Sequence, residues 1–261
     1  MDIIIFGGQS NMQGESESCT PGVVAHAYEY KFLDDTIVPL ENPVGEDILR
    51  DGTRGRVYMS SKDATWGDEH VFGSACFGNT SLIPKFCEAY IAVTGAEVLA
   101  VPVAKGSTFI ETWLPGGYGH EILVQKAQAA INKAKNLGHK VEHIFFVWLQ
   151  GECDAIIRNT KEYYKEKIAD LNEVLKDKLQ IEKFGVIRVG RFTNDERDLE
   201  IIDAQDEICE EHKDFLMLTT IATELNTKPE YMNPNCPGHF GTKGLELIGQ
   251  VAGKALGNSR A

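Results

Sequence analysis

Short, continuous apolar runs alternate along the chain with longer segments in which apolar residues recur at helical spacing. Five of the apolar runs have the length and the β-branched or aromatic content of buried strands, at residues 3–6, 97–103, 143–148, 184–189 and 215–221. Strands that are apolar throughout are typical of parallel sheets, which helices cover on both faces.

The segments between these runs predict helices. In residues 160–179, Tyr164, Ile168 and Leu171 begin an apolar stripe at spacings of three and four, and Thr160 is a candidate N-cap. Similar stripes are found at residues 121–137, 199–212 and 244–256. The alternation of strands and helices predicts an α/β fold, a three-layer α/β/α sandwich around a five-stranded parallel sheet.

Neither an internal repeat nor a dividing linker interrupts this pattern. We therefore expect residues 1–261 to form one domain, with an irregular insertion around residues 39–73 that is polar and rich in glycine. The six cysteines are scattered without a CxxC pair, which favours a reduced state.

The net charge of the chain limits the classes of molecule that it is expected to bind. Lys and Arg total 26 against 39 for Asp and Glu, a net charge of −13, which disfavours binding to nucleic acid or to an anionic membrane surface. No apolar run is long enough to span a bilayer, and the chain starts on a strand rather than on a signal peptide. The expected location is the cytoplasm, with secretion possible if a leader has been removed.

The first strand ends at Gly7 and Gly8, with Ser10 directly behind them. In parallel α/β sheets, ligands bind at the carboxyl ends of the strands, so Ser10 is a candidate nucleophile. Two other interpretations of this segment exist. Ser10 could cap a helix that begins near Asn11. A phosphate-binding loop is favoured still less, because Gly14 is followed by glutamate rather than by Lys-Ser/Thr.

A nucleophilic serine needs a base and an acid that orients it. His239 lies in a Pro/Gly-rich loop before the last helix and is the candidate base. His139 and His143 are four residues apart, but they span a loop-to-strand junction without a carboxylate cluster, so we predict no metal site there. Cys236 and Cys153 are disfavoured as nucleophiles, because a proline lies between Cys236 and His239 and the negative charge of Glu152 adjoins Cys153.

Polar groups that could take part in catalysis follow two further predicted strands. In "VWLQGECD", the side-chain amide of Gln150 can donate a hydrogen bond, and Glu152 could orient an imidazole. In "AKGSTFIETW", Gly106 offers a backbone N–H to an oxyanion. The ends of the predicted strands thus bring nucleophile, donors, acid and base to one edge of the sheet, although acids beside a glycine also occur in plain solvated loops.

The segments "GQSNMQG", "AKGSTFIETW", "WLQGECD" and a late Gly-His-Phe-Gly loop, in this order, resemble the SGNH hydrolase superfamily with its flavodoxin-like sheet. More narrowly, they resemble the branch of sialate O-acetylesterases and the acetylxylan esterases of carbohydrate esterase family six. The resemblance implies a serine esterase without metal or organic cofactor, acting on a small acetylated carbohydrate. It assigns Ser10 as nucleophile, His239 as base, and the Ser10 N–H, Gly106 and Gln150 as oxyanion donors.

One position departs from the pattern of the superfamily, where many members carry an aspartate three residues before the histidine. Here that residue is Cys236. Either Glu152 orients His239, which we favour, or a Ser-His dyad works with help from backbone carbonyls. Asp154 is expected to brace its loop, so Glu152→Ala should reduce activity more than Asp154→Ala.

The substrate is less defined by the sequence. Gln9, Asn11, Trp113 and Asp154 are candidate substrate contacts, with Trp113 as a platform for a sugar ring. Other candidates are the aromatic residues Tyr58 and Trp66 and the cationic residues Lys105, Arg54 and Arg56. A sialate, another acetylated sugar or a xylo-oligosaccharide would fit. The alternatives are a general carboxylesterase or acyltransferase and a non-catalytic sugar-binding relative, and the oligomeric state stays open.

Overall fold

The computed structural model describes residues 1–46, 48 and 79–260. Most of the insertion expected around residues 39–73 therefore lies outside the described residues, together with the candidate substrate contacts Arg54, Arg56, Tyr58 and Trp66.

A central sheet organises the described part of the chain, in the order β3-β2-β4-β1-β5-β6-β7. Its strands are β1 (Asp2–Gly8), β2 (Ala27–Lys31), β3 (Thr36–Pro39), β4 (Val98–Ala104), β5 (Ile144–Leu149), β6 (Lys183–Ile187) and β7 (Phe215–Thr219). All neighbouring pairs are parallel except β2 and β3. The five predicted strands are confirmed, but the sheet has seven strands rather than five. The two that were missed, β2 and β3, form one edge of the sheet and carry polar residues between their apolar ones.

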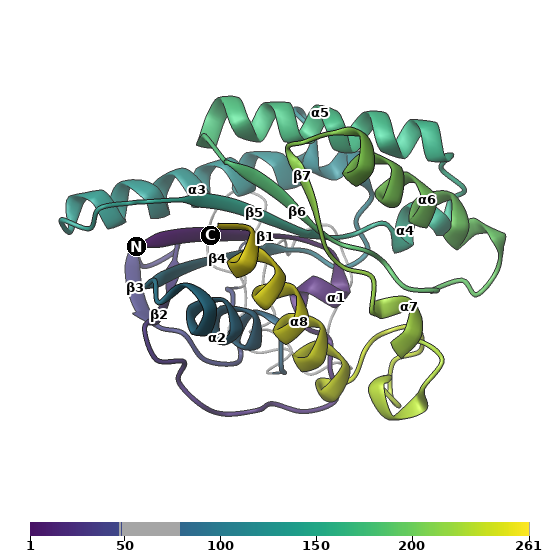
Figure 1. Ribbon diagram of the computed structural model, residues 1–261, viewed down its shortest axis with the longest axis horizontal. Helices are drawn as coiled ribbons and strands as arrows, with labels where there is room; N and C mark the ends of the chain where they lie inside the picture. The colour runs from purple at the N-terminus through teal and green to yellow at the C-terminus, as the bar shows by residue number, and fades with distance from the viewer. Residues whose placement is uncertain (47, 49–78, 261) are drawn as a thin grey trace.

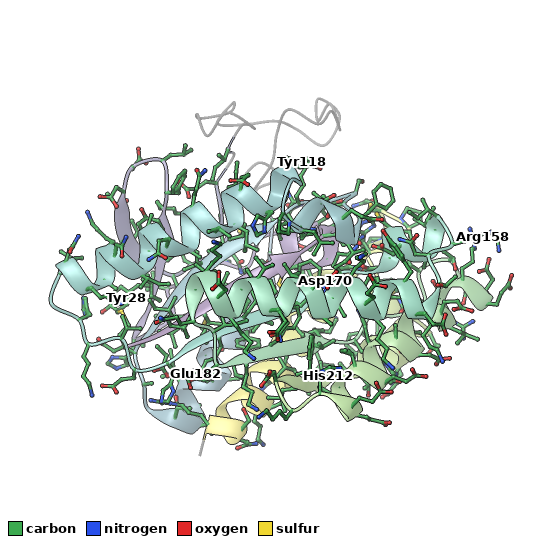
Figure 2. The ribbon with its side chains drawn as sticks, turned by 90° about the horizontal axis from the view of Figure 1, so that it is seen from above. Tyr28, Tyr118, Arg158, Asp170, Glu182 and His212 are labelled. Atoms are coloured by element: carbon green, nitrogen blue, oxygen red, sulfur yellow. The ribbon has the colours of Figure 1, made fainter. Side chains whose placement is uncertain are left out.

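Helices cover both faces of the sheet, which confirms the three-layer sandwich (Figure 1). They are α1 (Ser10–Gln13), α2 (Ile83–Thr94), α3 (Tyr118–Asn136), α4 (Glu152–Ile156), α5 (Lys161–Leu179), α6 (Glu196–Glu211), α7 (Ala222–Leu225) and α8 (Thr242–Arg260), with the 3₁₀ turns η1 (Ile110–Trp113) and η2 (Pro229–Tyr231). Helices α3 and α5 lie on one face, and α2 packs against α8 on the other. Figure 2 looks onto the first of these faces, where Asp170 of α5 is exposed to solvent. The predicted cap is confirmed, since the Thr160 side chain accepts a hydrogen bond from the Tyr163 N–H.

The two glycines at the end of β1 are required by close packing. A Cβ on Gly7 would lie 2.5 Å from the ring of Phe146, and one on Gly8 would lie 2.1 Å from the backbone oxygen of Leu149. Gly8 also has a φ of 145°, which side-chain-bearing residues rarely adopt. These glycines let β1 run between β4 and β5 and turn directly into α1, which brings Ser10 to the carboxyl edge of the sheet.

None of the helices in the described ranges combines the length and the apolar character needed to cross a bilayer.

Candidate active site

Ser10 and His239 meet at the carboxyl end of β1, although 229 residues separate them in sequence. Nε2 of His239 lies 2.8 Å from Oγ of Ser10. Ser10 is the first residue of α1 and Gln9 occupies the N-cap position, so the hydroxyl of Ser10 is not used as the helix cap. The predicted nucleophile and the predicted base are therefore in hydrogen-bond contact, which is the geometry that proton transfer requires.

The other ring nitrogen of His239 faces its own loop. Nδ1 lies 3.1 Å from Sγ of Cys236 and 3.1 Å from the carbonyl oxygen of Pro237. When Nδ1–H donates to the Pro237 carbonyl, Nε2 keeps its lone pair and can accept the proton of Ser10. Burial lowers the pKa of His239 below its ordinary value, which favours this neutral form. The alternative of a Ser-His dyad assisted by a backbone carbonyl matches this arrangement.

Glu152 does not make the contact with His239 that the sequence led us to expect. It begins α4, and its Oε1 accepts a hydrogen bond from Nδ2 of Asn11 at 2.8 Å. Oδ1 of Asn11 in turn accepts from the backbone N–H of Phe240 at 3.1 Å. Glu152 is therefore linked to the histidine loop through Asn11.

A different carboxylate, Glu15, lies beside the imidazole. Its Oε2 is 3.6 Å from Nε2 of His239, and the residue is only 6 % exposed. Burial raises the pKa of Glu15 to about 7, with Lys105 acting in the opposite direction. Among the described residues, Oε1 of Glu15 has no hydrogen-bond partner. Sequence reasoning missed Glu15, whose one available signal is its position immediately after "GQSNMQG".

Two of the expected oxyanion donors are engaged with protein acceptors. The N–H of Gly106 donates to Oε1 of Gln13 at 2.6 Å. The amide of Gln150, which is fully buried, donates to the Thr108 carbonyl at 2.9 Å and to Asp154. The N–H of Ser10, by contrast, lies in the first turn of α1, where backbone N–H groups have no intrahelical acceptor.

The four candidate substrate contacts are buried, and each has protein partners. Oε1 of Gln9 accepts from the backbone N–H of Gly151 and of Cys153, and Asn11 bridges Glu152 and Phe240 as described above. Asp154 accepts from Asn159 at 2.7 Å and from the backbone N–H of Ile110. The polar atoms of Gln9, Asn11 and Asp154 brace the strand ends, and direct contact of these residues with a sugar stays a prediction.

Trp113 is likewise part of the core rather than a platform for a sugar. It is fully buried, packs edge to face on Trp148 with the ring centroids 5.6 Å apart, and donates from Nε1 to Thr108. The predicted stacking on a sugar ring is therefore corrected.

Comparison with known proteins places the chain in a family. The family model described as "Carbohydrate esterase, sialic acid-specific acetylesterase" matches residues 1–257. A probable carbohydrate esterase of Arabidopsis thaliana is 24 % identical over 196 residues, which make up 72 % of this chain and 68 % of the plant protein.

Solved structures agree on the architecture. An Arabidopsis thaliana protein superposes with a TM-score of 0.68 at 16 % identity over 98 % of both chains. A carbohydrate acetylesterase of Xanthomonas citri superposes with a TM-score of 0.55 at 14 % identity, over 99 % of this chain and 57 % of its own. A lipase/acylhydrolase of Enterococcus faecalis superposes with a TM-score of 0.52 at 16 % identity, over 99 % and 97 %. At these identities the similarity establishes the fold, and it confirms the predicted α/β class.

Proposed function

This chain belongs to the carbohydrate esterase family described as sialic acid-specific acetylesterase, whose members are carboxylic ester hydrolases, and on that premise we propose that it removes O-acetyl groups from a carbohydrate with Ser10 as its nucleophile. The observation that carries the proposal is the 2.8 Å contact between Oγ of Ser10 and Nε2 of His239. It is supported by the Nδ1 contact with the Pro237 carbonyl, which leaves Nε2 free to accept a proton.

The proposed reaction proceeds by acyl transfer in two halves. Oγ of Ser10 attacks the acetyl carbonyl carbon while His239 takes the hydroxyl proton, and the resulting oxyanion accepts a hydrogen bond from the Ser10 N–H. His239 then gives its proton to the departing sugar oxygen as the C–O bond breaks, which leaves an acetyl-serine. Water, deprotonated by His239, attacks this ester, and acetate leaves as Ser10 regains its proton.

His239 becomes positively charged during each half of the reaction, and neighbouring groups stabilise that charge. The imidazolium is stabilised by the Pro237 carbonyl at Nδ1 and by the ionised Glu15 carboxylate at 3.6 Å from Nε2. In this proposal Gln150 and Asp154 act indirectly, because they hold the end of β5 against Thr108 and α4. A second oxyanion donor becomes available at Gly106 if the side chain of Gln13 turns away on substrate binding.

The first experiment is hydrolysis of p-nitrophenyl acetate by wild type and Ser10→Ala, with Ser259→Ala, at the end of α8, as a matched control. We expect Ser10→Ala to lose activity by at least about a thousandfold, as other serine hydrolases do when the nucleophile is removed, and Ser259→Ala to retain it. Activity that persists in a folded Ser10→Ala variant would overturn the assignment of the nucleophile.

A panel of esters then identifies the alcohol portion of the substrate. O-acetylated sialic acid, acetylated xylo-oligosaccharides and aryl esters of longer acyl chains are compared by kcat/KM. A preference for an acetylated sugar is expected. Equal or greater kcat/KM on the longer aryl esters would instead identify a general carboxylesterase.

A further inference from the structure

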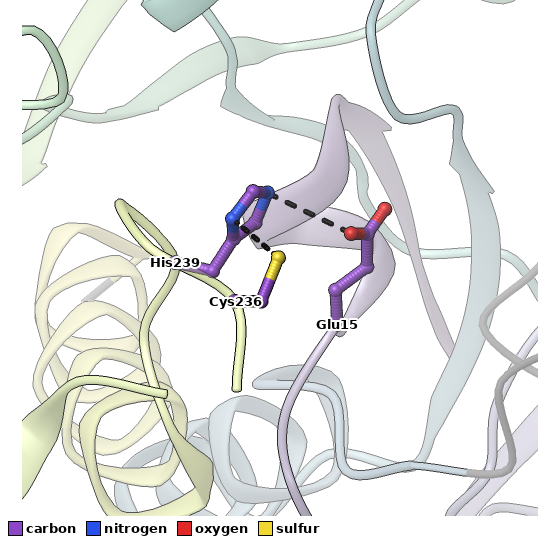
Figure 3. A group of neighbouring side chains, drawn as sticks. All are labelled: Glu15, Cys236 and His239. Atoms are coloured by element: carbon purple, nitrogen blue, oxygen red, sulfur yellow. Dashed lines mark hydrogen bonds and ion pairs between the residues drawn. The ribbon is translucent and has the colours of Figure 1, made fainter. Parts of the chain in front are cut away.

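Three side chains at the edge of the active site bring a carboxylate, a thiol and an imidazole together. Glu15 follows α1, whereas Cys236 and His239 lie in the loop before α8 (Figure 3). One ligand atom from each of the three lies within 4.8 Å of the other two. Sγ of Cys236 is 3.1 Å from Nδ1 of His239, and Oε2 of Glu15 is 3.6 Å from Nε2.

From this cluster we propose that Glu15, Cys236 and His239 form a binding site for a thiophilic divalent cation of the Zn²⁺ class, and that the bound ion inhibits the esterase. Zn²⁺ binds Cys sulfur at about 2.3 Å and His nitrogen or carboxylate oxygen at about 2.0–2.2 Å, in tetrahedral geometry. The donor atoms of such a site are therefore roughly 3.3–3.7 Å apart. The two short separations here run to different ring nitrogens, of which an ion takes one. With one donor atom from each residue the set lies within 4.8 Å, so the side chains draw together by up to about 1 Å on binding. Mg²⁺ and Ca²⁺ prefer oxygen ligands and have no comparable set in this cluster.

An unpaired buried oxygen of Glu15 also points to a cation. Glu15 is 6 % exposed, and within the described ranges its Oε1 has no hydrogen-bond partner. A buried carboxylate oxygen without a partner costs free energy, and a metal ion would supply its missing contact. Cys236 and His239 are only partly buried, so an ion can reach the cluster from the side of the loop.

Inhibition follows from the chemistry of the imidazole and rests on the proposed function. The ion needs a ring lone pair, and coordination through Nε2 takes the pair that would accept the Ser10 proton. Coordination through Nδ1 breaks the contact with the Pro237 carbonyl that holds the ring in place. On binding, the thiol proton of Cys236 passes to solvent and a sulfur–metal bond forms, without change of oxidation state. The sequence predicts no metal for the reaction itself, and this ion takes no part in it.

Metal binding is tested independently of catalysis. Zn²⁺ is titrated by calorimetry into metal-free Ser10→Ala, which keeps all three ligands, and Co²⁺ is used as a spectroscopic probe of a thiolate bond. One equivalent of Zn²⁺ should bind, and the cobalt form should show a thiolate-to-metal charge-transfer band. Cys236→Ser and Cys236→Ala, each made in the Ser10→Ala background, should bind at least about 100-fold more weakly, since loss of an outer-shell partner alone costs 10–100-fold.

Cys209→Ala is the matched control, because Cys209 is a half-buried cysteine on α6 outside the cluster. It should bind Zn²⁺ as tightly as its parent. Failure of Ser10→Ala to bind Zn²⁺, or binding that survives in both folded Cys236 variants, would overturn the site.

Inhibition is then measured with p-nitrophenyl acetate, with enzyme-free blanks at each metal concentration. Wild type should lose most of its activity near one equivalent of Zn²⁺, keep it with Mg²⁺, and regain it on addition of chelator. Binding without loss of activity would overturn the inhibitory role. If wild type proves inactive on every ester while Ser10→Ala still binds Zn²⁺ through Cys236, the proposed function fails and the metal site stands.

Discussion

The two ring nitrogens of His239 face different chemistry. Nδ1 meets an uncharged thiol and a carbonyl, whereas Nε2 meets the Ser10 hydroxyl with the Glu15 carboxylate behind it. A carboxylate 3.6 Å from an imidazolium is worth about 1–5 kcal/mol at an effective dielectric constant between 80 and 20. We infer that Glu15 contributes the negative charge that Cys236 cannot supply.

Glu15→Gln should therefore change the pH profile of the reaction as well as its rate. Burial raises the pKa of Glu15 to about 7, so the carboxylate forms, and stabilises the imidazolium, as the pH rises through 7. We expect kcat/KM for p-nitrophenyl acetate to fall about tenfold or more at pH 8 and less at pH 6, which corresponds to about 1.4 kcal/mol. The rise near pH 7 should disappear from the profile of the variant.

The control for this prediction is Glu210→Gln, which removes an exposed carboxylate of α6. Its profile should match that of wild type. A Glu15→Gln variant with an unchanged profile would show that Glu15 does not act on His239.

Asp154 and Glu152 differ in the number of donors that each satisfies. Asp154 is fully buried and accepts from Gln150, Asn159 and the Ile110 N–H, whereas Glu152 accepts from the Asn11 side chain. Each buried donor left without an acceptor costs about 1–3 kcal/mol.

Asp154→Ala should consequently lower the free energy of unfolding by about 3 kcal/mol or more, and by more than Glu152→Ala. Urea denaturation of both variants measures the difference. This expectation concerns stability, and the ranking of their activities predicted from sequence stays a separate prediction. Equal losses of stability would contradict the role of Asp154 as the brace of its loop.

At the scale of elements, the active site depends on how the turn into α1 is joined to the loop before α8. Nδ2 of Asn233 donates to the backbone oxygen of Glu15 at 2.7 Å, and the N–H of Asn233 donates to the His239 carbonyl at 2.9 Å. Asn11 makes the second link through the Phe240 N–H. Asn233 and Asn11 thus fix the position of the base His239 relative to the nucleophile Ser10.

Asn233→Ala should loosen this junction without touching a reacting atom. We expect kcat to fall between about tenfold and 100-fold, because a displacement of about 1 Å in a catalytic group has costs of this order. KM for the small aryl ester should change little. Asn235→Ala, at an exposed position in the same loop, is the control and should behave as wild type. A similar kcat for both variants would show that Asn233 does not position His239.

At the scale of the whole molecule, the sequence was sufficient to predict the strands and helices that bury continuous apolar surface. The strands β1, β4, β5, β6 and β7 and the four longest of the described helices could be predicted because their apolar runs and stripes are uninterrupted. The strands β2 and β3, at one side of the sheet, were missed because sequences such as "AYEYK" bury only part of their residues.

The site was predictable to the extent that topology determines it. Ser10 and the His239 loop could be placed together because parallel strands deliver their carboxyl ends to one edge. The partners of Gly106 and Gln150 could not be predicted, since they depend on where the Gln13 and Asp154 side chains pack. Glu15 lies in no periodic pattern, so only the fold could show its contact with the imidazole.

Buried carboxyl groups also give the whole molecule an unusual dependence of stability on pH. Burial raises the pKa of Glu15 to about 7 and that of Asp154 to about 6, and it also raises the pKa of Glu29 and Glu152. A carboxyl whose pKa is higher in the folded state than in the unfolded chain binds more protons when folded. Its contribution is therefore complete below about pH 4 and is lost as the pH rises through the folded value.

We expect the melting temperature to fall between pH 5.5 and pH 8, the window in which Glu15 and Asp154 ionise in the folded protein. Glu46, whose pKa is lowered, acts in the opposite direction but titrates below this window. Glu15 accounts for a loss of about 3 kcal/mol over the whole range from pH 4 to pH 8, at 1.36 kcal/mol for each unit of pKa, and about 2 kcal/mol of this loss falls between pH 5.5 and pH 8. In Glu15→Gln the fall should be shallower, whereas the exposed Glu210→Gln should follow wild type. A melting temperature that rises toward pH 8 would show that these carboxyl groups are already ionised at pH 5.5 in the fold.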